Sequence, residues 1–331
     1  MSNRFTESLF RPGFTAWVLL PCTALYWLGW RSYEAIYRLG LKHPQRAHPA
    51  VICVGNLVVG GSGKTPFTRW LAEQLTARGY SVVLSLSGYG SPRSVAATLA
   101  PEGELDPAEW GDEPALMRSY LPSVPMVVGR RRVLAAQIAA ERFPGSVLLL
   151  DDGYQHLPLQ KDFALIMDVG TPVRYCLPSG PYRQPARDII RADVDVHRQM
   201  DPARVQTLSR RDGSRVSTDW LAGRSISLLV AVAQPFWVQY AIEELGARMT
   251  YGQFLDDHDP LTAPTLLKDV PRDRPLVVTA KDWVKLRRRT DLAGIEVMIF
   301  DYEYEFPENL VENLVTRLDS ELAARGVQPV G

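Results

Sequence analysis

The segment from Val51 to Thr65 constrains this chain most, because it joins an apolar run to a glycine-rich turn that ends in Gly-Lys-Thr. An apolar run followed by glycines and then by a helical pattern predicts a buried strand, a loop and a helix. Glycines let consecutive backbone N–H groups converge on phosphate oxygens, and a lysine and a hydroxyl at this place reach the outer phosphates and a magnesium ion. We therefore expect a phosphate-binding loop made of Gly60, Gly61, Ser62, Gly63, Lys64 and Thr65.

The loop departs from the strict pattern G-x-x-x-x-G-K-[ST], because Val58 stands where the first glycine is required. The helix that should follow has Phe67, Leu71 and Leu75 at helical spacing, and its positive N-terminal end would point at the same anion. A glycine-rich turn between an ordinary strand and helix is the alternative interpretation of this segment.

Length and charge narrow the class of protein. A chain of 331 residues exceeds the usual size of one domain, so two domains are expected. The 37 basic and 37 acidic residues cancel, which argues against a general nucleic-acid binder. The three cysteines, Cys22, Cys53 and Cys176, form no C-x-x-C pair, so neither a disulfide scaffold nor a cysteine-based zinc site is indicated.

The run from Pro12 to Trp30 carries no charge and contains Trp17, Tyr26 and Trp27. As a helix it would be about 28 Å long, close to the ~30 Å of a bilayer core. However, Pro21 lies in its middle, and clustered aromatic residues beside the flanking arginines favour the membrane interface as much as the bilayer centre. We expect residues 1–45 to form a membrane-associated helical segment lying in or shallowly anchored at the surface; a full span and a buried helix of a soluble protein are the alternatives.

Strands and helices alternate along the rest of the chain. Over residues 46–220 the alternation predicts a doubly wound parallel α/β sheet like that of P-loop NTPases. The strand patterns lie at residues 81–86, 147–150 and 163–167, and the helical patterns at 113–120 and 131–142. Residues 178–219 lack periodicity and are expected to be loop and hinge, apart from a short strand near 194–196. A smaller α/β domain is expected at residues 221–331, with strands at 226–233, 276–279 and 297–300 and a helix at 236–245. An amphipathic closing helix is expected at 307–325, and it could pack back on the first domain.

Two acids, Asp151 and Asp152, follow the aliphatic run that begins at Val147. In P-loop enzymes a carboxylate at such a strand tip holds the magnesium that the loop hydroxyl also contacts. We therefore expect Thr65, Asp151 and Asp152 to be metal ligands. A strand that merely ends at a polar turn is the alternative.

Acids and a histidine recur at two further places, Gly111-Asp112-Glu113-Pro114 and Asp256-Asp257-His258-Asp259. A kinase that acts on a hydroxyl needs a base to accept the alcohol proton, and an aspartate or an Asp-His pair can do this. Taken singly, Asp112 could be a helix cap and His258 a hydrogen-bonded loop residue.

The motifs, in their order along the chain, resemble those of the tetraacyldisaccharide 4'-kinases of lipid A synthesis, and the resemblance extends from about residue 12 to 300. The matching segments are Val54–Leu57 leading into Val59–Pro66, Ser87–Gly90, Gly111–Pro114, Asp151–His156, Leu177–Pro185, Asp257-His258 and Thr279–Asp282. The chain departs from the family pattern at Ser87, Tyr182 and Gln184, where arginine, an aliphatic residue and glutamate are usual.

The resemblance implies an enzyme at the cytoplasmic face of the bacterial inner membrane that uses ATP and Mg²⁺. It would move the γ-phosphoryl group to the 4'-hydroxyl of the lipid tetraacyldisaccharide 1-phosphate and so form lipid IVA. Asp112 and His258 would be the catalytic dyad, and Lys64 would act beside them. Thr65 and Asp151 would hold magnesium. The metal and phosphate environment would be completed by Asp152, Gln155 and His156. Glu113 and Arg132 would support them. We further expect a monomer that binds no nucleic acid.

Two other functions fit a phosphate-binding loop beside an uncharged N-terminal segment. One is a P-loop kinase or ligase with a soluble substrate, in which residues 12–30 are simply packed. The other is a membrane-docked nucleotide switch. Because the loop and His258 fall in different domains, we also expect catalysis to require the domains to close around nucleotide and acceptor.

Overall fold

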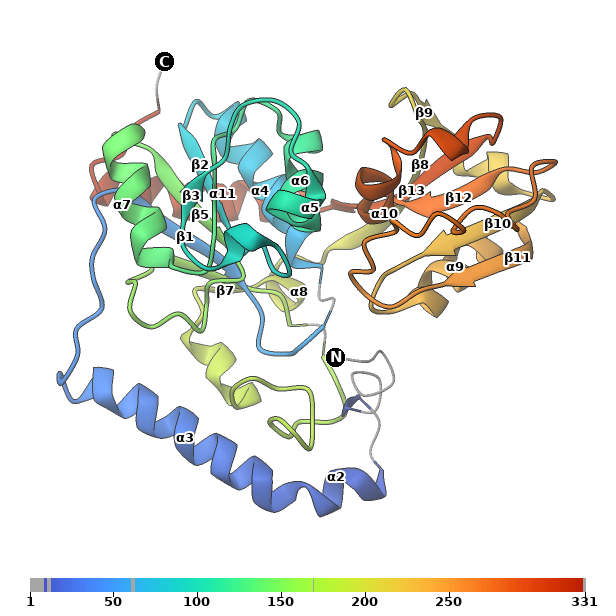
Figure 1. Ribbon diagram of the computed structural model, residues 1–331. Helices are drawn as coiled ribbons and strands as arrows, with labels where there is room; N and C mark the ends of the chain where they lie inside the picture. Colours follow the sequence, from blue (N-terminus) through green and yellow to red (C-terminus); the bar gives the residue numbers. More distant parts are fainter. Residues whose placement is uncertain (1–8, 11–12, 61–62, 169, 330–331) are drawn as a thin grey trace.

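The computed structural model describes residues 9–10, 13–60, 63–168 and 170–329, which form two α/β units side by side and a helical N-terminal segment below them (Figure 1). Each unit is built on its own sheet, one with seven strands and one with six. The fold predicted from the sequence, a doubly wound parallel sheet with a second, smaller α/β unit, is confirmed.

The first sheet has the strand order β3-β4-β2-β5-β1-β6-β7, and every pair is parallel except β3 with β4. Its strands are β1 (Ala50–Gly55), β2 (Val82–Leu86), β3 (Thr98–Leu99), β4 (Met126–Val128), β5 (Val147–Asp151), β6 (Phe163–Ile166) and β7 (Val194–Asp195). The central strands β1, β2 and β5 are buried along their whole length. Helices on both faces of a parallel sheet explain why these strands are continuous apolar runs.

Alternate residues of β1 face opposite layers of helices. The helices of this unit are α4 (Lys64–Ala77), α5 (Pro107–Trp110), α6 (Asp112–Tyr120), α7 (Arg132–Arg142), α8 (Val196–Gln199) and α11 (Glu308–Ala324), with the 3₁₀ helices η1 (Pro92–Ser94) and η2 (Ala186–Arg191). Ile52 and Val54 pack with α4, α6 and α11 in one core. Val51 and Cys53 pack with α7 in another. The C-terminal helix α11 thus returns to the first unit after the chain has built the second.

The second sheet has the order β11-β10-β12-β13-β8-β9. Its strands are β8 (Ala203–Arg210), β9 (Arg215–Val216), β10 (Ser225–Val230), β11 (Arg248–Phe254), β12 (Leu276–Thr279) and β13 (Val297–Glu305). The pairs among β10, β11, β12 and β13 are parallel, whereas β8 runs antiparallel to β13 and to β9. The helices are α9 (Pro235–Glu244) and α10 (Ala280–Leu286), with η3 (Thr218–Leu221) and η4 (Thr290–Leu292).

The expectation that residues 178–219 are loop and hinge is wrong for its second half. Strand β8 pairs with β13 from Ala203 opposite Glu305 to Arg210 opposite Met298. Most of β8 is only half-buried, so its sequence is polar and lacks the apolar run by which the parallel strands are recognised. The second sheet therefore takes in chain that precedes residue 220, and we place the proposed division between the two units before Ala203.

In the described part of the N-terminal segment, α2 (Phe14–Val18) and α3 (Leu20–Arg38) take the place of one helix over residues 12–30. Pro21 lies in the first turn of α3, where the missing N–H costs no intrahelical hydrogen bond. The helix then continues past Trp30 through Arg31 and Arg38. Among the residues that the structure describes, no helix is long and apolar enough to cross a membrane.

We predict that Leu318→Ala in α11 destabilises the first unit. Leu318 is fully buried in the core that contains β1, so truncation should lower the free energy of unfolding by about 2–5 kcal/mol. The exposed Asn313 of the same helix gives the matched control, and Asn313→Ala should change it by less than about 0.5 kcal/mol. Urea unfolding of both variants measures this, and equal midpoints would show that α11 is not part of that core.

Candidate active site

The loop after β1 and the end of β5 meet at the same edge of the sheet. The register pairs Val54 with Asp151, so the strand tip carrying the acids lies beside the start of the loop. The loop reaches α4 through Gly63, whose φ of 77° is in the left-handed region that glycine adopts without strain. Lys64 and Thr65 are then the first residues of α4, at its positive end. Gly61 and Ser62 lie outside the described residues.

Gly63 is also required by its surroundings. A Cβ at this position would lie 1.9 Å from Tyr304 Oη, which comes from β13 of the second sheet. Tyr304 is buried, so its ring cannot easily move aside. The second unit therefore presses directly on the loop of the first.

Val58, the residue that breaks the strict loop pattern, forms an antiparallel bridge with Tyr182. The bridge continues on both sides, with Arg183 N donating to Leu57 O at 2.7 Å and Val59 N to Pro181 O at 2.8 Å. Val58 and Tyr182 are each 1% exposed and share one apolar cluster. The loop thus begins with strand-like pairing. Val58 and Tyr182, two residues that depart from the expected sequence patterns, pack against each other.

Asp151 lies at the centre of the polar contacts. Its carboxylate accepts hydrogen bonds from Thr65 Oγ1 and Thr68 Oγ1, both at 3.2 Å. Arg132 donates to the Asp151 backbone oxygen at 2.6 Å. Burial and then the negative charge of Glu113 raise the pKa of Asp151 to about 7. A buried carboxylate among other acids is the kind of site that a cation stabilises.

The donor set at Asp151 fits a hard divalent cation. A hydroxyl and a carboxylate oxygen are ligands that Mg²⁺ prefers, and Mg²⁺ usually binds one or two carboxylates together with substrate phosphates. Across the described parts of the chain, no group of three or more His, Cys, Asp or Glu could hold a metal by itself. Phosphate oxygens would have to supply the remaining ligands.

Asp152 faces two cations. Arg183 Nη1 donates to both of its oxygens, at 2.9 and 3.1 Å, and Lys64 Nζ lies 3.9 Å from Oδ2. Burial opposes ionisation, but the charges of Lys64 and Arg183 outweigh it and lower the pKa of Asp152. No role was assigned to Arg183 from the sequence. The residue lies in the matching segment Leu177–Pro185, which could have pointed to it.

Gln155 and His156 follow this strand tip. Gln155 Nε2 donates to Asn56 O at 2.7 Å and so ties the segment to the start of the loop. Burial, with the charges of Lys161 and Arg132, lowers the pKa of His156 to about 4, so its ring is neutral at neutral pH.

Asp112 and His258 meet across the two units. Asp112 begins α6, and His258 lies in the loop after β11 with a φ of 65°. His258 Nδ1 is 3.1 Å from Asp112 Oδ2, and Lys285 Nζ of α10 is 3.5 Å from the same oxygen. Burial would raise the pKa of Asp112, but the hydrogen bond from His258 and the charge of Lys285 lower it.

Lys281 fixes the orientation of the histidine ring. Its Nζ lies 3.3 Å from His258 Nε2 and 3.1 Å from Asp257 Oδ1. An ammonium group can only donate, so Nε2 accepts and the ring proton is on Nδ1, which donates to Asp112. From the sequence, no role was assigned to Lys281, which lies in the matching segment Thr279–Asp282, or to Lys285, although their spacing of four places both on one face of a helix that Thr279 caps.

Glu113 connects the two halves of the site. It follows Asp112 in α6, and its charge acts on Asp151 at the tip of β5. Helix α6, which begins with Asp112 and Glu113, also packs against α4, which begins with Lys64 and Thr65. An anion cradle, an oxygen site for a cation and a carboxylate-imidazole pair can together bind a nucleotide and deprotonate an acceptor.

A family model described as tetraacyldisaccharide-1-P 4'-kinase (LpxK) matches residues 15–319. A tetraacyldisaccharide 4'-kinase of Verminephrobacter eiseniae is 33% identical over 294 residues, which cover 83% of this chain and 66% of that protein. One of Polaromonas naphthalenivorans is 31% identical over 328 residues, 94% of each. The crystal structure of LpxK from Aquifex aeolicus in complex with ATP matches with a TM-score of 0.76 at 25% identity, over 92% of this chain and 99% of that one.

We predict that Gly63→Ala weakens binding of a nucleoside triphosphate at least about tenfold, because its methyl group must displace Tyr304 from the loop. Gly145→Ala is the matched control: Gly145 has a φ of 79° and no heavy atom within 4 Å of an added Cβ. The control carries the same backbone strain and should bind normally. Calorimetric titration compares them, and equal affinities would remove the role of close packing at Gly63.

Proposed function

The chain belongs to the tetraacyldisaccharide-1-phosphate 4'-kinase (LpxK) family, and from that membership we propose how its residues carry out the reaction. It is an ATP-dependent kinase that transfers the γ-phosphoryl group to the 4'-hydroxyl of tetraacyldisaccharide 1-phosphate, giving lipid IVA in lipid A biosynthesis. The observation that best supports the residue assignment is the contact between His258 and Asp112, at the start of a helix, α6, that packs against α4, whose first residues are Lys64 and Thr65.

Gly60 to Thr65 bind the triphosphate of ATP, with Lys64 neutralising the outer phosphates. Thr65 and Asp151 hold Mg²⁺, which when bound offsets negative charge on the phosphates. The raised pKa of Asp151 supports this assignment, because a nearby cation would restore the ionised form. Asp152 pairs with both Lys64 and Arg183 and so holds Lys64 in place. Arg132 fixes the tip of β5 through its hydrogen bond to the backbone oxygen of Asp151.

Asp112 accepts the proton of the 4'-hydroxyl. Its lowered pKa keeps the carboxylate ionised at neutral pH. His258 positions it, since the ring donates from Nδ1 to Asp112 while the Nε2 lone pair is engaged by Lys281. This arrangement supports Asp112 rather than His258 as the acceptor of the proton. Closure of the two units around ATP and the sugar stays a prediction.

We infer that the enzyme acts as a monomer at the cytoplasmic face of the bacterial inner membrane, without nucleic acid. Helices α2 and α3 expose Phe14, Trp17, Val18, Leu25 and Leu28, so a peripheral or shallow attachment through these residues is supported. The acyl chains of the acceptor cannot leave a bilayer cheaply, and an enzyme that works at its surface avoids that cost.

The function is tested by transfer of radiolabel from ATP in detergent micelles. We expect labelled lipid only when tetraacyldisaccharide 1-phosphate and Mg²⁺ are both present. Labelling of a soluble acceptor in place of the lipid would favour a kinase or ligase with a soluble substrate. ATP hydrolysis that the lipid does not change would favour a nucleotide switch.

We predict that Asp112→Asn and His258→Ala each lower kcat by about 10²–10⁴-fold, the usual contribution of a positioned base, while the KM for ATP changes little. Asp269→Asn, at an exposed position in the second unit, is the matched control and should leave kcat unchanged. Circular dichroism should show all three variants folded. Near-normal turnover of Asp112→Asn would refute its role as proton acceptor.

A further inference from the structure

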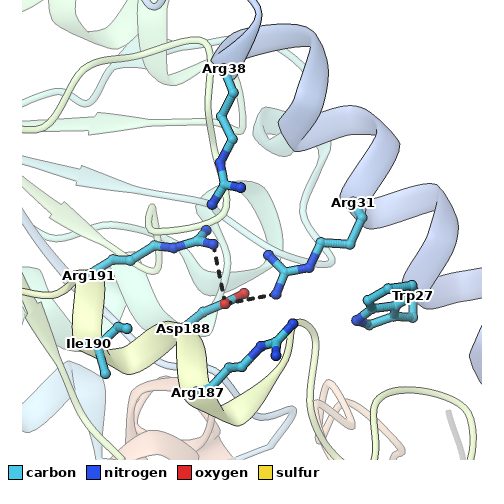
Figure 2. Close-up of a pocket in the computed structure, with 7 residues that line it drawn as sticks. All are labelled: Trp27, Arg31, Arg38, Arg187, Asp188, Ile190 and Arg191. Atoms are coloured by element: carbon cyan, nitrogen blue, oxygen red, sulfur yellow. Dashed lines mark hydrogen bonds and ion pairs between the residues drawn. The ribbon is translucent and has the colours of Figure 1, made fainter.

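A cavity of about 430 Å³ lies between α3 and η2, and none of the residues assigned above to catalysis lines it. Arginines line it from both elements: Arg31 and Arg38 from α3, and Arg187 and Arg191 from η2. Figure 2 shows the four guanidinium groups turned toward a common space around Asp188. So many arginines around one small space indicate an anionic ligand.

Two buried acids hold two of these arginines in place. Asp188 Oδ1 is 3.0 Å from Arg31 Nη2 and 3.4 Å from Arg191 Nη2. Glu34 pairs with the same two arginines, at 2.7 Å from Arg191. Asp188, which lines the cavity, and Glu34, which lies behind these arginines, are 2% and 6% exposed, so both acids are buried and leave the arginines nearer to solvent.

Arg38 and Arg187 add charge that these acids do not balance. Within the described residues, neither arginine has an acidic partner closer than 4 Å. Four guanidinium groups face two carboxylates, which leaves two positive charges in the cavity. The phosphodiester of a phospholipid carries one negative charge and would neutralise one of them, and planar guanidinium groups match phosphate oxygens in geometry.

Apolar side chains border the same cavity. Trp27 and Ile190 line it and are 40% and 83% exposed. Leu25 and Leu28 of α3 are also exposed, at 71% and 56%. A ligand that fits both features carries a phosphate next to apolar chains, which is the chemistry of a phospholipid at a membrane surface.

We propose that this cavity binds the phosphate of an anionic phospholipid of the bilayer and so fixes α3 at the membrane surface. The proposal rests on the proposed function, which places the enzyme at a membrane. The acceptor lipid also carries a phosphate, on the sugar opposite to the one whose 4'-hydroxyl must reach Asp112 and His258. In the described chain, no cavity-lining side chain has a hydrogen bond or ion pair with either residue. We assign the cavity to a bilayer lipid because exposed apolar side chains of α3, Leu25 and Leu28, lie on the helix that lines it.

The test compares Arg38→Gln/Arg187→Gln with a control that removes equal charge elsewhere. Arg142 and Arg248 are exposed and lie in α7 and β11, so Arg142→Gln/Arg248→Gln is the control. Cosedimentation at low salt uses phosphatidylcholine vesicles with and without phosphatidylglycerol. We expect the first double variant to lose about 30-fold in affinity for the phosphatidylglycerol vesicles, and the control to bind like wild type.

The transfer assay in detergent micelles free of phospholipid is run on the same proteins. The proposal expects the KM for the acceptor lipid to be unchanged in Arg38→Gln/Arg187→Gln. A several-fold rise in that KM with normal vesicle binding would assign the cavity to the acceptor's own phosphate and overturn the proposal. Equal vesicle binding by both double variants would also overturn it. If wild type transfers no label at all, the proposed function fails, while the vesicle result still decides the lipid site.

Discussion

The hydrogen bond between His258 and Asp112 is the contact on which the active site depends, because it joins side chains from the two different units. Charges buried at such a junction cost free energy unless each has partners. Here Lys285 pairs with Asp112 and Asp282, and Lys281 with Asp257. A network of this kind contributes little net stability. Few relative orientations of the two units satisfy all of its members, so the network fixes the position of Asp112, the proposed base.

A second constraint comes from the order of strands in the first sheet. Strand β1 lies between β5 and β6, so the loop after β1 emerges beside the acids at the end of β5. The chain must turn sharply there, and Asp152 takes a φ of 56°, an uncommon value for a residue other than glycine. Its ion pair with Arg183 compensates for that strain, and the same pair places a carboxylate near Lys64. Backbone strain and electrostatics therefore occur at the same residue, as is frequent at functional sites.

The sequence predicted those parts of the protein in which one pattern dominates. Strands β1, β5 and β12 are apolar runs buried on both faces, and the phosphate loop and the acids of β5 follow such runs directly. Strand β8 was missed because it is half-buried and pairs with β13, which lies almost ninety residues later in the chain. Lys281 and Lys285 were missed for a related reason. Their partners His258 and Asp112 come from other elements, and no local pattern shows which charges will meet after folding.

The N-terminal helices are connected to the phosphate site by a short series of contacts. In α3, Tyr26 Oη donates to the backbone oxygen of Arg183 at 2.7 Å, and Thr23 Oγ1 donates to Ser179 Oγ at 2.7 Å. The side chain of Arg183 pairs with Asp152, which in turn faces Lys64. The segment that contains Arg183 also pairs with residues 57–59 of the loop. Because α3 and the loop share this one segment, a membrane surface that orients α3 also orients the phosphate loop. If α3 lies on the membrane as proposed, its depth and tilt would set how the acceptor's 4'-hydroxyl approaches the nucleotide.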